Sequence, residues 1–291
     1  MAIARLDNEV FFKKAFTDRL VFQSFVKDIV GIEVNPEKIE TEKSFQPKLG
    51  NINFKYDIFA EDILKRVIIE IQKVEYDHNF DRFLHYHLQA ITEQQRSSDN
   101  YSVDKTVYTI VVITAPYTLN KETNRQEKDE VLVSSLNPKN LKGQERPLFN
   151  HQLIFLNPNY RDEDTPKNYS DWLDLIYESI HHPDNPNINL DNSGVKRATE
   201  IVTYENISPD EWEQSKIEAS KKIVLNIVRE KSLAEGIEIG LEKGMEKGFE
   251  KGMEKVAIVS IQKGYPNDVI VELTGLSIEQ IELLRKELNE Q

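Results

Sequence analysis

The chain has 291 residues, no cysteine and a formal net charge of −13. This length can bury a full-sized core in one large or two modest domains. Without cysteine, a disulfide framework and a metal site with cysteine ligands are excluded. No run of about 18 uncharged apolar residues occurs, and the first residues lack an apolar signal region. We therefore expect a cytoplasmic protein without a membrane span.

The acidic charge is concentrated in the C-terminal part of the chain. Residues 1–115 carry 15 Lys and Arg against 18 Asp and Glu, whereas residues 116–291 carry 22 against 32. A protein that coats nucleic acid generally needs a basic surface. Any contact with DNA must therefore depend on a local site.

The first 115 residues show the pattern helix, three strands, helix, strand. Apolar side chains at helical spacing predict the helices, and β-branched or alternating runs predict the strands. We expect one first helix with a stop at Gly31, and a helix that breaks near Asp18 is the alternative. The expected elements are a helix over 8–29, strands over 38–47, 51–60 and 67–72, a helix over 79–96 and an apolar strand over 107–115.

The rest of the chain is predicted to be mainly helical. Strands over 132–136 and 151–156 precede a helix over 169–180, and further helices follow over 195–204 and from Pro209. The Asn-, Asp- and Pro-rich stretch 184–193 is the candidate boundary. We divide the chain into an α/β domain at 1–183 with a core at about 7–115, a loop and connecting helix at 184–207, and a helical tail at 208–291.

Two carboxylates are predicted to meet on a hairpin. If 52–60 and 66–73 pair about a turn between Ile63 and Leu64, Asp57 lies opposite Glu70 and Lys55 opposite Gln72. Side chains two positions apart share a face, and directly opposed Cβ atoms are about 5 Å apart. Carboxylates this close repel each other unless a proton or a cation lies between them.

A cation site is one interpretation of this pair. Carboxylate, carbonyl and water oxygens suit Mg²⁺ or Mn²⁺, which can clamp a phosphate and lower the pKa of an attacking water. The alternative is that Asp57 and Glu70 simply face solvent on a half-exposed hairpin. Against it, Glu70 interrupts an otherwise apolar run, where a charge without a partner is unfavourable.

The spacing of these residues resembles a known nuclease motif. Asp57, followed 13 residues later by Glu70-x-Gln72, resembles the PD-(D/E)XK nuclease superfamily, and within it the Rpn family of recombination-promoting nucleases and transposases. The opening run 8–16, NEVFFKKAF, and the segment 80–86 after the motif also resemble that family. The resemblance covers about 7–115, and the tail resembles tails of the same family.

The resemblance implies an α/β restriction-endonuclease-like core with a helical C-terminal extension. It further implies a metal-dependent endonuclease that hydrolyses phosphodiester bonds in DNA and acts in recombination or on mobile elements. Asp57, Glu70 and the backbone carbonyl of Ile71 would hold Mg²⁺ or Mn²⁺. Gln72 stands where lysine is usual, and its amide can offer only hydrogen bonds instead of a positive charge.

Four further residues are candidates for the site. Lys55 shares the predicted face and could contribute the missing charge. Glu9 is either an additional acidic ligand or a solvated helix residue. Arg82 and Tyr86 share one helix face and could line the site and contact phosphate. Alternatively, Arg82 is an exposed helix residue and Tyr86 a core aromatic.

The tail contains five tetrads that begin at Gly236 and mostly read Gly-x-Glu-Lys. Each four-residue step advances a helix by about 400°, so glycine and its apolar neighbour form a slowly winding stripe. Glycine costs about 1 kcal/mol relative to alanine in a helix, so a partner could be needed. We expect a homo-oligomer formed through these repeats, with a flexible linker as the alternative. The acidic helical hairpin over 266–288 is more suited to protein than to DNA contact.

The second functional hypothesis is a nuclease fold that has lost catalysis. It would serve as a DNA- or protein-binding assembly module. Gln72 and the acidic net charge favour this alternative.

Overall fold

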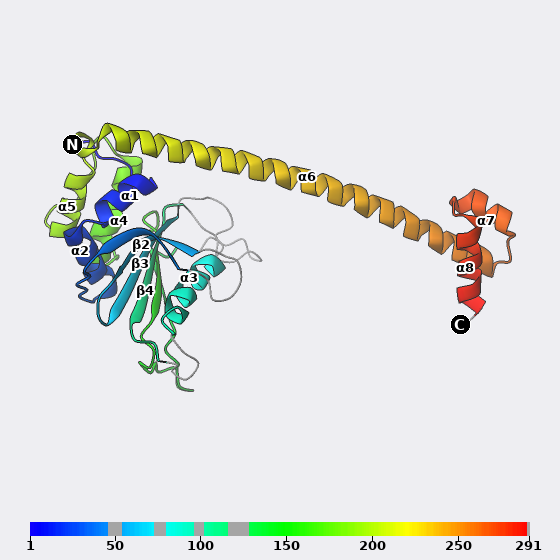
Figure 1. The fold of residues 1–291 in the computed structure, drawn as a ribbon, viewed down its shortest axis with the longest axis horizontal. Coiled ribbons are helices and arrows are strands. Elements are labelled where there is room, and N and C mark those ends of the chain that lie inside the picture. The colour runs from blue at the N-terminus through cyan, green and yellow to red at the C-terminus, as the bar shows by residue number, and fades with distance from the viewer. Residues whose placement is uncertain (46–53, 73–79, 96–101, 116–127, 290–291) are drawn as a thin grey trace. The chain divides into compact units, whose positions relative to one another are not determined.

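The computed structural model describes residues 1–45, 54–72, 80–95, 102–115 and 128–289 (Figure 1). The chain forms two compact units, Met1–Ala219 and Ser220–Gln291. The elements of the described residues are α1 (Glu9–Phe16), α2 (Arg19–Val30), β1 (Ile39–Phe45), β2 (Phe54–Glu61), β3 (Lys65–Gln72), α3 (Phe80–Thr92), β4 (Thr106–Ile113), β5 (Val131–Ser135), β6 (Gln152–Leu156), α4 (Lys167–His181), α5 (Ser193–Ile201), the 3₁₀ turn η1 (Tyr204–Asn206), α6 (Pro209–Gln262), α7 (Asn267–Thr274) and α8 (Ile278–Asn289).

The first unit contains a mixed sheet in the strand order β1-β2-β3-β4-β6-β5. Strands β3, β4 and β6 are parallel, while β1, β2 and β5 pair antiparallel with their neighbours. The predicted order of helix, three strands, helix and strand is confirmed, with the first helix divided near Asp18. The predicted hairpin register is confirmed where β2 and β3 pair, from Ile58 with Ile69 to Glu61 with Arg66.

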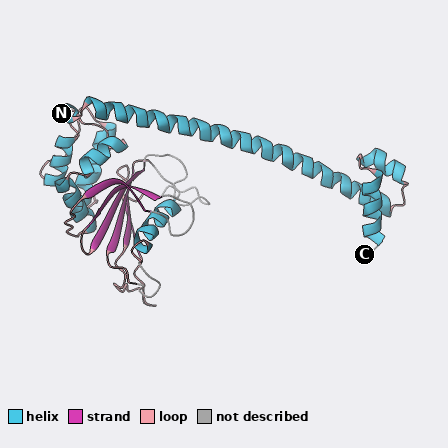
Figure 2. Ribbon diagram, in the orientation of Figure 1, coloured by secondary structure: helices cyan, strands magenta, loops and turns pink. Residues whose placement is uncertain are grey.

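Helices cover both faces of this sheet (Figure 2). The larger core lies between one face and helices α1, α2, α4 and α5, where Phe16, Phe25 and Trp172 pack edge-on or tilted against one another. Helix α3 packs on the other face through two smaller apolar clusters. Both faces of the central strands are therefore buried, as their continuous apolar sequences require.

The predicted first helix is divided into α1 and α2. The helix breaks at Asp18 because the backbone of this residue is extended. The Asp18 side chain accepts hydrogen bonds from the N–H groups of Leu20 and Val21 and thereby caps α2. Gly31 stops α2 with a φ of 75°, a conformation that glycine adopts readily. The structure thus shows the alternative of a break near Asp18, and the stop at Gly31 agrees with the sequence.

Residues C-terminal to α4 complete the core of the first unit. Val195 and Ala198 of α5 are fully buried in it. Asn192 caps α5 and also donates a hydrogen bond to Asp28 of α2. The first turns of α6 add Trp212, whose ring packs edge-on against Phe11 of α1 at 4.9 Å.

The second unit consists of most of α6 with α7 and α8. Ala257, Ile270 and Ile281, one from each helix, form its small buried cluster. The predicted hairpin near the C-terminus is confirmed as α7 and α8, separated by Gly275 with a φ of 68°. Within the described ranges, no helix combines the length and apolar character needed to cross a membrane.

Candidate metal-binding site

The carboxylates of Asp57 and Glu70 each accept a hydrogen bond from the backbone of the neighbouring strand. Beyond the pair Ile58–Ile69, the backbone N–H of Asp57 donates to the Glu70 carboxylate at 3.1 Å. The N–H of Ile71 donates in turn to the Asp57 carboxylate at 3.0 Å. Both acids thus replace ladder hydrogen bonds with contacts from their side chains, and they stay adjacent where the hairpin opens.

This pair of carboxylates lies in a place with little access to water. Glu70 is only 2 % exposed, and its pKa is raised well above the usual value by burial and then by the charge of Asp57. Burial also raises the pKa of Asp57, although the ammonium of Lys13 opposes that effect. The environment therefore favours a proton or a cation beside these acids.

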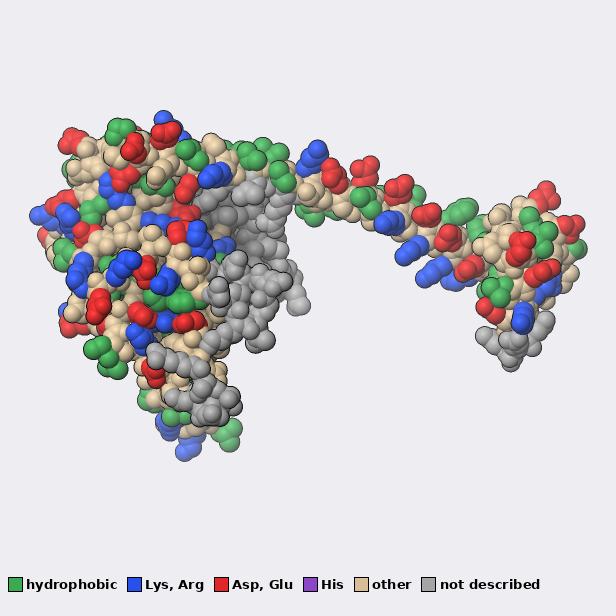
Figure 3. Space-filling view, in the orientation of Figure 1, with side chains coloured by type: hydrophobic (Ala, Val, Ile, Leu, Met, Phe, Trp, Pro, Cys, Tyr) green, Lys and Arg blue, Asp and Glu red, His purple; other side chains and the backbone are tan. Residues whose placement is uncertain are grey.

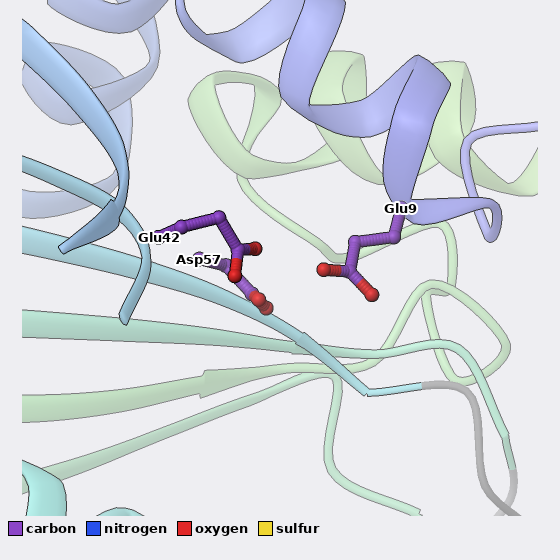
Figure 4. Close-up of side chains that lie close together, drawn as sticks. All are labelled: Glu9, Glu42 and Asp57. Atoms are coloured by element: carbon purple, nitrogen blue, oxygen red, sulfur yellow. The ribbon is translucent and has the colours of Figure 1, made fainter. Parts of the chain in front are cut away.

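Two more carboxylates lie near Asp57. Oxygens of Glu9, Glu42 and Asp57 are all within 4.8 Å of one another, and Figure 4 shows the three side chains converging from α1, β1 and β2. Helix α1 begins directly at Glu9 because the Asn8 side chain caps its first turn. Glu42 lies between Thr41 and Lys43, which pair with Ile58 and Tyr56 on either side of Asp57.

A lysine lies among these three carboxylates. The ammonium of Lys13 forms ion pairs with Glu9 and Glu42 and lies 3.5 Å from Asp57. Its side chain is only 14 % exposed. Lys55 also pairs with Glu42, but its side chain is 61 % exposed and lies at the outer edge of the cluster.

The donor chemistry fits a hard divalent cation. Three carboxylate oxygens already lie close together, and a fourth carboxylate, Glu70, adjoins Asp57. Mg²⁺ and Mn²⁺ prefer such oxygen ligands, completed by water. Within the described ranges, the Lys13 ammonium is the positive charge that contacts all three carboxylates.

The other predicted site residues make contacts of their own on β3 and α3. Gln72 is half-buried at the end of β3, and its carbonyl accepts a hydrogen bond from the backbone of Thr114 at 2.9 Å. Arg82 donates to the Tyr86 hydroxyl at 3.1 Å on α3. The charge of Arg82 partly lowers the pKa of Glu70, after the larger effects of burial and Asp57.

Reasoning from the sequence did not identify Glu42 or Lys13 as site residues. Lys13 carried a signal, because Glu9 and Lys13 are four residues apart and such pairs attract on one helix face. Glu42 carried none, since it belongs to a loosely alternating strand whose register against β2 depends on tertiary pairing. Its φ of 56° is a local irregularity that the sequence does not announce.

Comparison with protein families identifies a match that covers most of the chain. A family model described as PD-(D/E)XK nuclease family transposase matches residues 18–232. The matched segment includes Glu42, Asp57, Glu70 and Gln72, while α1 with Glu9 and Lys13 precedes it. No curated protein and no solved structure matches the chain significantly.

Proposed function

This chain belongs to the PD-(D/E)XK nuclease family transposases, and we propose that it is a metal-dependent endonuclease that hydrolyses phosphodiester bonds in DNA. The observation that carries the proposal is the joined pair Asp57 and Glu70, with Glu9 and Glu42 beside it. Four acidic side chains from α1 and three neighbouring strands lie together here, and a divalent cation could take the place that the Lys13 ammonium now holds among three of them.

In this proposal Asp57, Glu70 and the Ile71 carbonyl hold Mg²⁺ or Mn²⁺, and Glu9 is an additional ligand. Glu42 joins this set because its carboxylate lies beside those of Glu9 and Asp57. A bound ion of this kind would offset the charge of the phosphate and lower the pKa of a nearby water. The Gln72 amide would orient water or phosphate by hydrogen bonding.

The contact with DNA would be local. Acidic and basic side chains are interspersed on the face of the first unit seen in Figure 3. Lys55, which is largely exposed beside the acidic cluster, and Arg82, with Tyr86 on α3, could contact phosphate. Because phosphate contacts weaken as salt is added, cleavage should fall as ionic strength rises.

Cleavage of supercoiled plasmid by the full chain tests the proposal. Nicking that requires Mg²⁺ or Mn²⁺ should be lost in Asp57→Asn and Glu70→Gln, which keep the size of each side chain. Glu40→Gln is the matched control, because Glu40 lies on β1 near Glu42 yet pairs with Lys38 and Lys43. Nicking that survives both site substitutions in a preparation free of contaminating nuclease would overturn the assignment.

A second function is favoured by Gln72 and by the net charge of −13. Without the usual lysine, the same fold could bind DNA or a protein without cutting it. A wild-type chain that shifts DNA in a binding assay, but does not cleave with either metal ion, would favour this alternative.

Besides DNA, we propose that a second copy of the chain is a partner, bound through α6. Leu241, Met245 and Phe249 are 65 %, 68 % and 66 % exposed on this helix. Glycines 236, 240, 244, 248 and 252 have nothing within 4 Å of the position that a Cβ would take, so the face beside the apolar residues is open. A second copy of the chain could cover this face at close backbone distance.

The charges along α6 support parallel pairing. Glutamates at 242, 246, 250 and 254 form one row, and lysines at 243, 247, 251 and 255 form another (Figure 3). Like charges four residues apart destabilise an isolated helix. In a parallel pair the lysine row of one copy lies on the same side as the glutamate row of the other, whereas an antiparallel pair would align like charges.

Analytical ultracentrifugation tests the proposed self-association through α6. Met245→Glu and Phe249→Glu together should convert a dimer to a monomer. Leu141→Glu is the control, since Leu141 is equally apolar and fully exposed but lies outside α6. A wild-type chain that sediments as a monomer at high micromolar concentration would contradict the proposal.

A further inference from the structure

We infer that Lys13 is an internal counter-cation that competes with the divalent ion for Glu9, Glu42 and Asp57, and so sets the affinity of this site for metal. The inference rests on the proposed metal-dependent function. It assigns a role to a residue outside the acidic motif and outside the matched segment 18–232.

The contacts of Lys13 carry the inference. An ammonium group donates three hydrogens, and that of Lys13 contacts all three carboxylates of the cluster. Lys13 lies on α1 one turn after Glu9, so its ammonium and the Glu9 carboxylate share one helix face.

The other cations near the cluster in the described part of the chain do not fill this role. Lys55 contacts Glu42 alone within the cluster and is mostly exposed, so water screens its charge. Lys14, the next residue on α1, points elsewhere, to Glu211 at 2.7 Å and to the backbone carbonyl of Asn206. Gln72 carries no charge. Of the cations compared, Lys13 is therefore the one best placed to balance the cluster.

The charge balance has a consequence for metal binding. Three carboxylates within 4.8 Å of one another repel strongly in a partly buried site unless a positive group lies among them. Lys13 relieves this repulsion in the ion-free protein. A divalent ion that enters must take over the same oxygens, so part of its binding free energy is used to displace the ammonium.

Binding of Mn²⁺ to the full chain, measured by isothermal titration calorimetry, tests this competition without any cleavage assay. Lys13→Met and Lys13→Gln remove the charge but keep most of the length of the side chain. Both should bind Mn²⁺ tighter than wild type by about tenfold or more. Lys13→Arg keeps the charge and should stay within about threefold of wild type. Lys14→Met removes a charge from the same helix and should leave the affinity within about twofold.

Thermal unfolding gives an independent second readout if the neutral variants fold poorly without metal. Mn²⁺ should raise the midpoint of Lys13→Met by more than it raises the midpoints of wild type and Lys14→Met. An equal or smaller rise, or an unchanged or weaker affinity in the calorimeter, would overturn the inference.

The inference and the proposed function fail in different ways. If wild type binds Mn²⁺ and Lys13→Met binds it no tighter, the competition alone is wrong. If neither protein binds Mn²⁺ at millimolar concentration, both the competition and the metal site are wrong. Tighter binding by Lys13→Met in a protein that never cuts DNA would support the competition and leave the binding-module alternative.

Discussion

The Glu70 carboxylate accepts a hydrogen bond from the backbone of Asp57, so one acid of the site holds in place the strand segment that carries the other. This contact needs an acceptor at residue 70 but not a negative charge. The charge is unfavourable there, because burial and then Asp57 raise the pKa of Glu70.

Glu70→Gln should therefore stabilise the folded protein while it abolishes activity. The amide oxygen can still accept from Asp57, and the repulsion with the Asp57 carboxylate disappears. We expect the free energy of unfolding at neutral pH to rise by about 1 kcal/mol or more, measured by urea denaturation in EDTA. Glu70→Leu, which has no acceptor, should not share this gain. A loss of stability in Glu70→Gln would show that the charge itself supports the fold.

Arg66 should be among the residues most sensitive to substitution in the first unit. Its side chain is only 7 % exposed, and it pairs with Glu61 and Glu93 and donates to the carbonyl of Ala90 at 2.8 Å. Arg66→Met should lower the free energy of unfolding by about 3 kcal/mol, because Glu61, Glu93 and the Ala90 carbonyl of α3 lose their shared partner on β3. Arg66→Lys should restore only part of this, since an ammonium lacks the planar fork. A change below about 0.5 kcal/mol for Arg66→Met would contradict this assignment.

His87 should make stability depend on pH in the mildly acidic range. Burial and then the charge of His151 lower its pKa from 6.5 to about 4. The unfolded chain therefore binds the proton more readily, so stability is fully present above about pH 6.5 and falls as the pH drops towards 4. The loss contributed by this group should reach about 3 kcal/mol.

Urea unfolding at several pH values checks the effect of His87. His87→Gln should flatten the curve between pH 4 and 6.5, whereas substitution of the exposed His85 by Gln should not. An unchanged slope in His87→Gln would mean that other groups dominate acid destabilisation.

Two glycines should respond in opposite ways to replacement by alanine. A Cβ on Gly194 would lie 2.4 Å from the Cβ of Ser24 and 2.9 Å from the Trp172 ring, so Gly194→Ala should destabilise the first unit by about 2 kcal/mol. A Cβ on Gly240 would meet nothing within 4 Å. Gly240→Ala should therefore stabilise the helical state of α6 by about 1 kcal/mol.

Circular dichroism and sedimentation separate the two effects at Gly240. Helicity should rise in Gly240→Ala, while dimerisation should weaken if the glycine face is packed against a second copy. Increased helicity without any change in association would place the contact on another face of α6.

The sequence was sufficient to predict the register of β2 against β3 but not to predict the full acidic cluster. Alternation and the turn near Ile63 predicted the pairing of Ile58 with Ile69, because a register error would move every apolar side chain to the wrong face. The position of Glu42 depends on how β1 joins the sheet and on its unusual φ of 56°. Such irregular positions follow from tertiary packing, and local patterns do not encode them.

The role of Lys13 was hidden for a different reason. Its four-residue spacing from Glu9 fits an ordinary surface ion pair as well as a site residue. Only the approach of α1 to β1 and β2 brings Glu42 and Asp57 to the same ammonium. A single helix cannot reveal which distant charges it will meet.

Helix α1 has a second set of contacts on its other side. Phe11 packs against Trp212, and Lys14 pairs with Glu211, so the first turn of α6 supports the helix that carries Glu9 and Lys13. A shortened protein that ends before Pro209 would lose this support and expose the Phe11 ring. The smallest fragment worth purifying for crystals or assays should therefore keep the chain through Ala219, where the first compact unit ends.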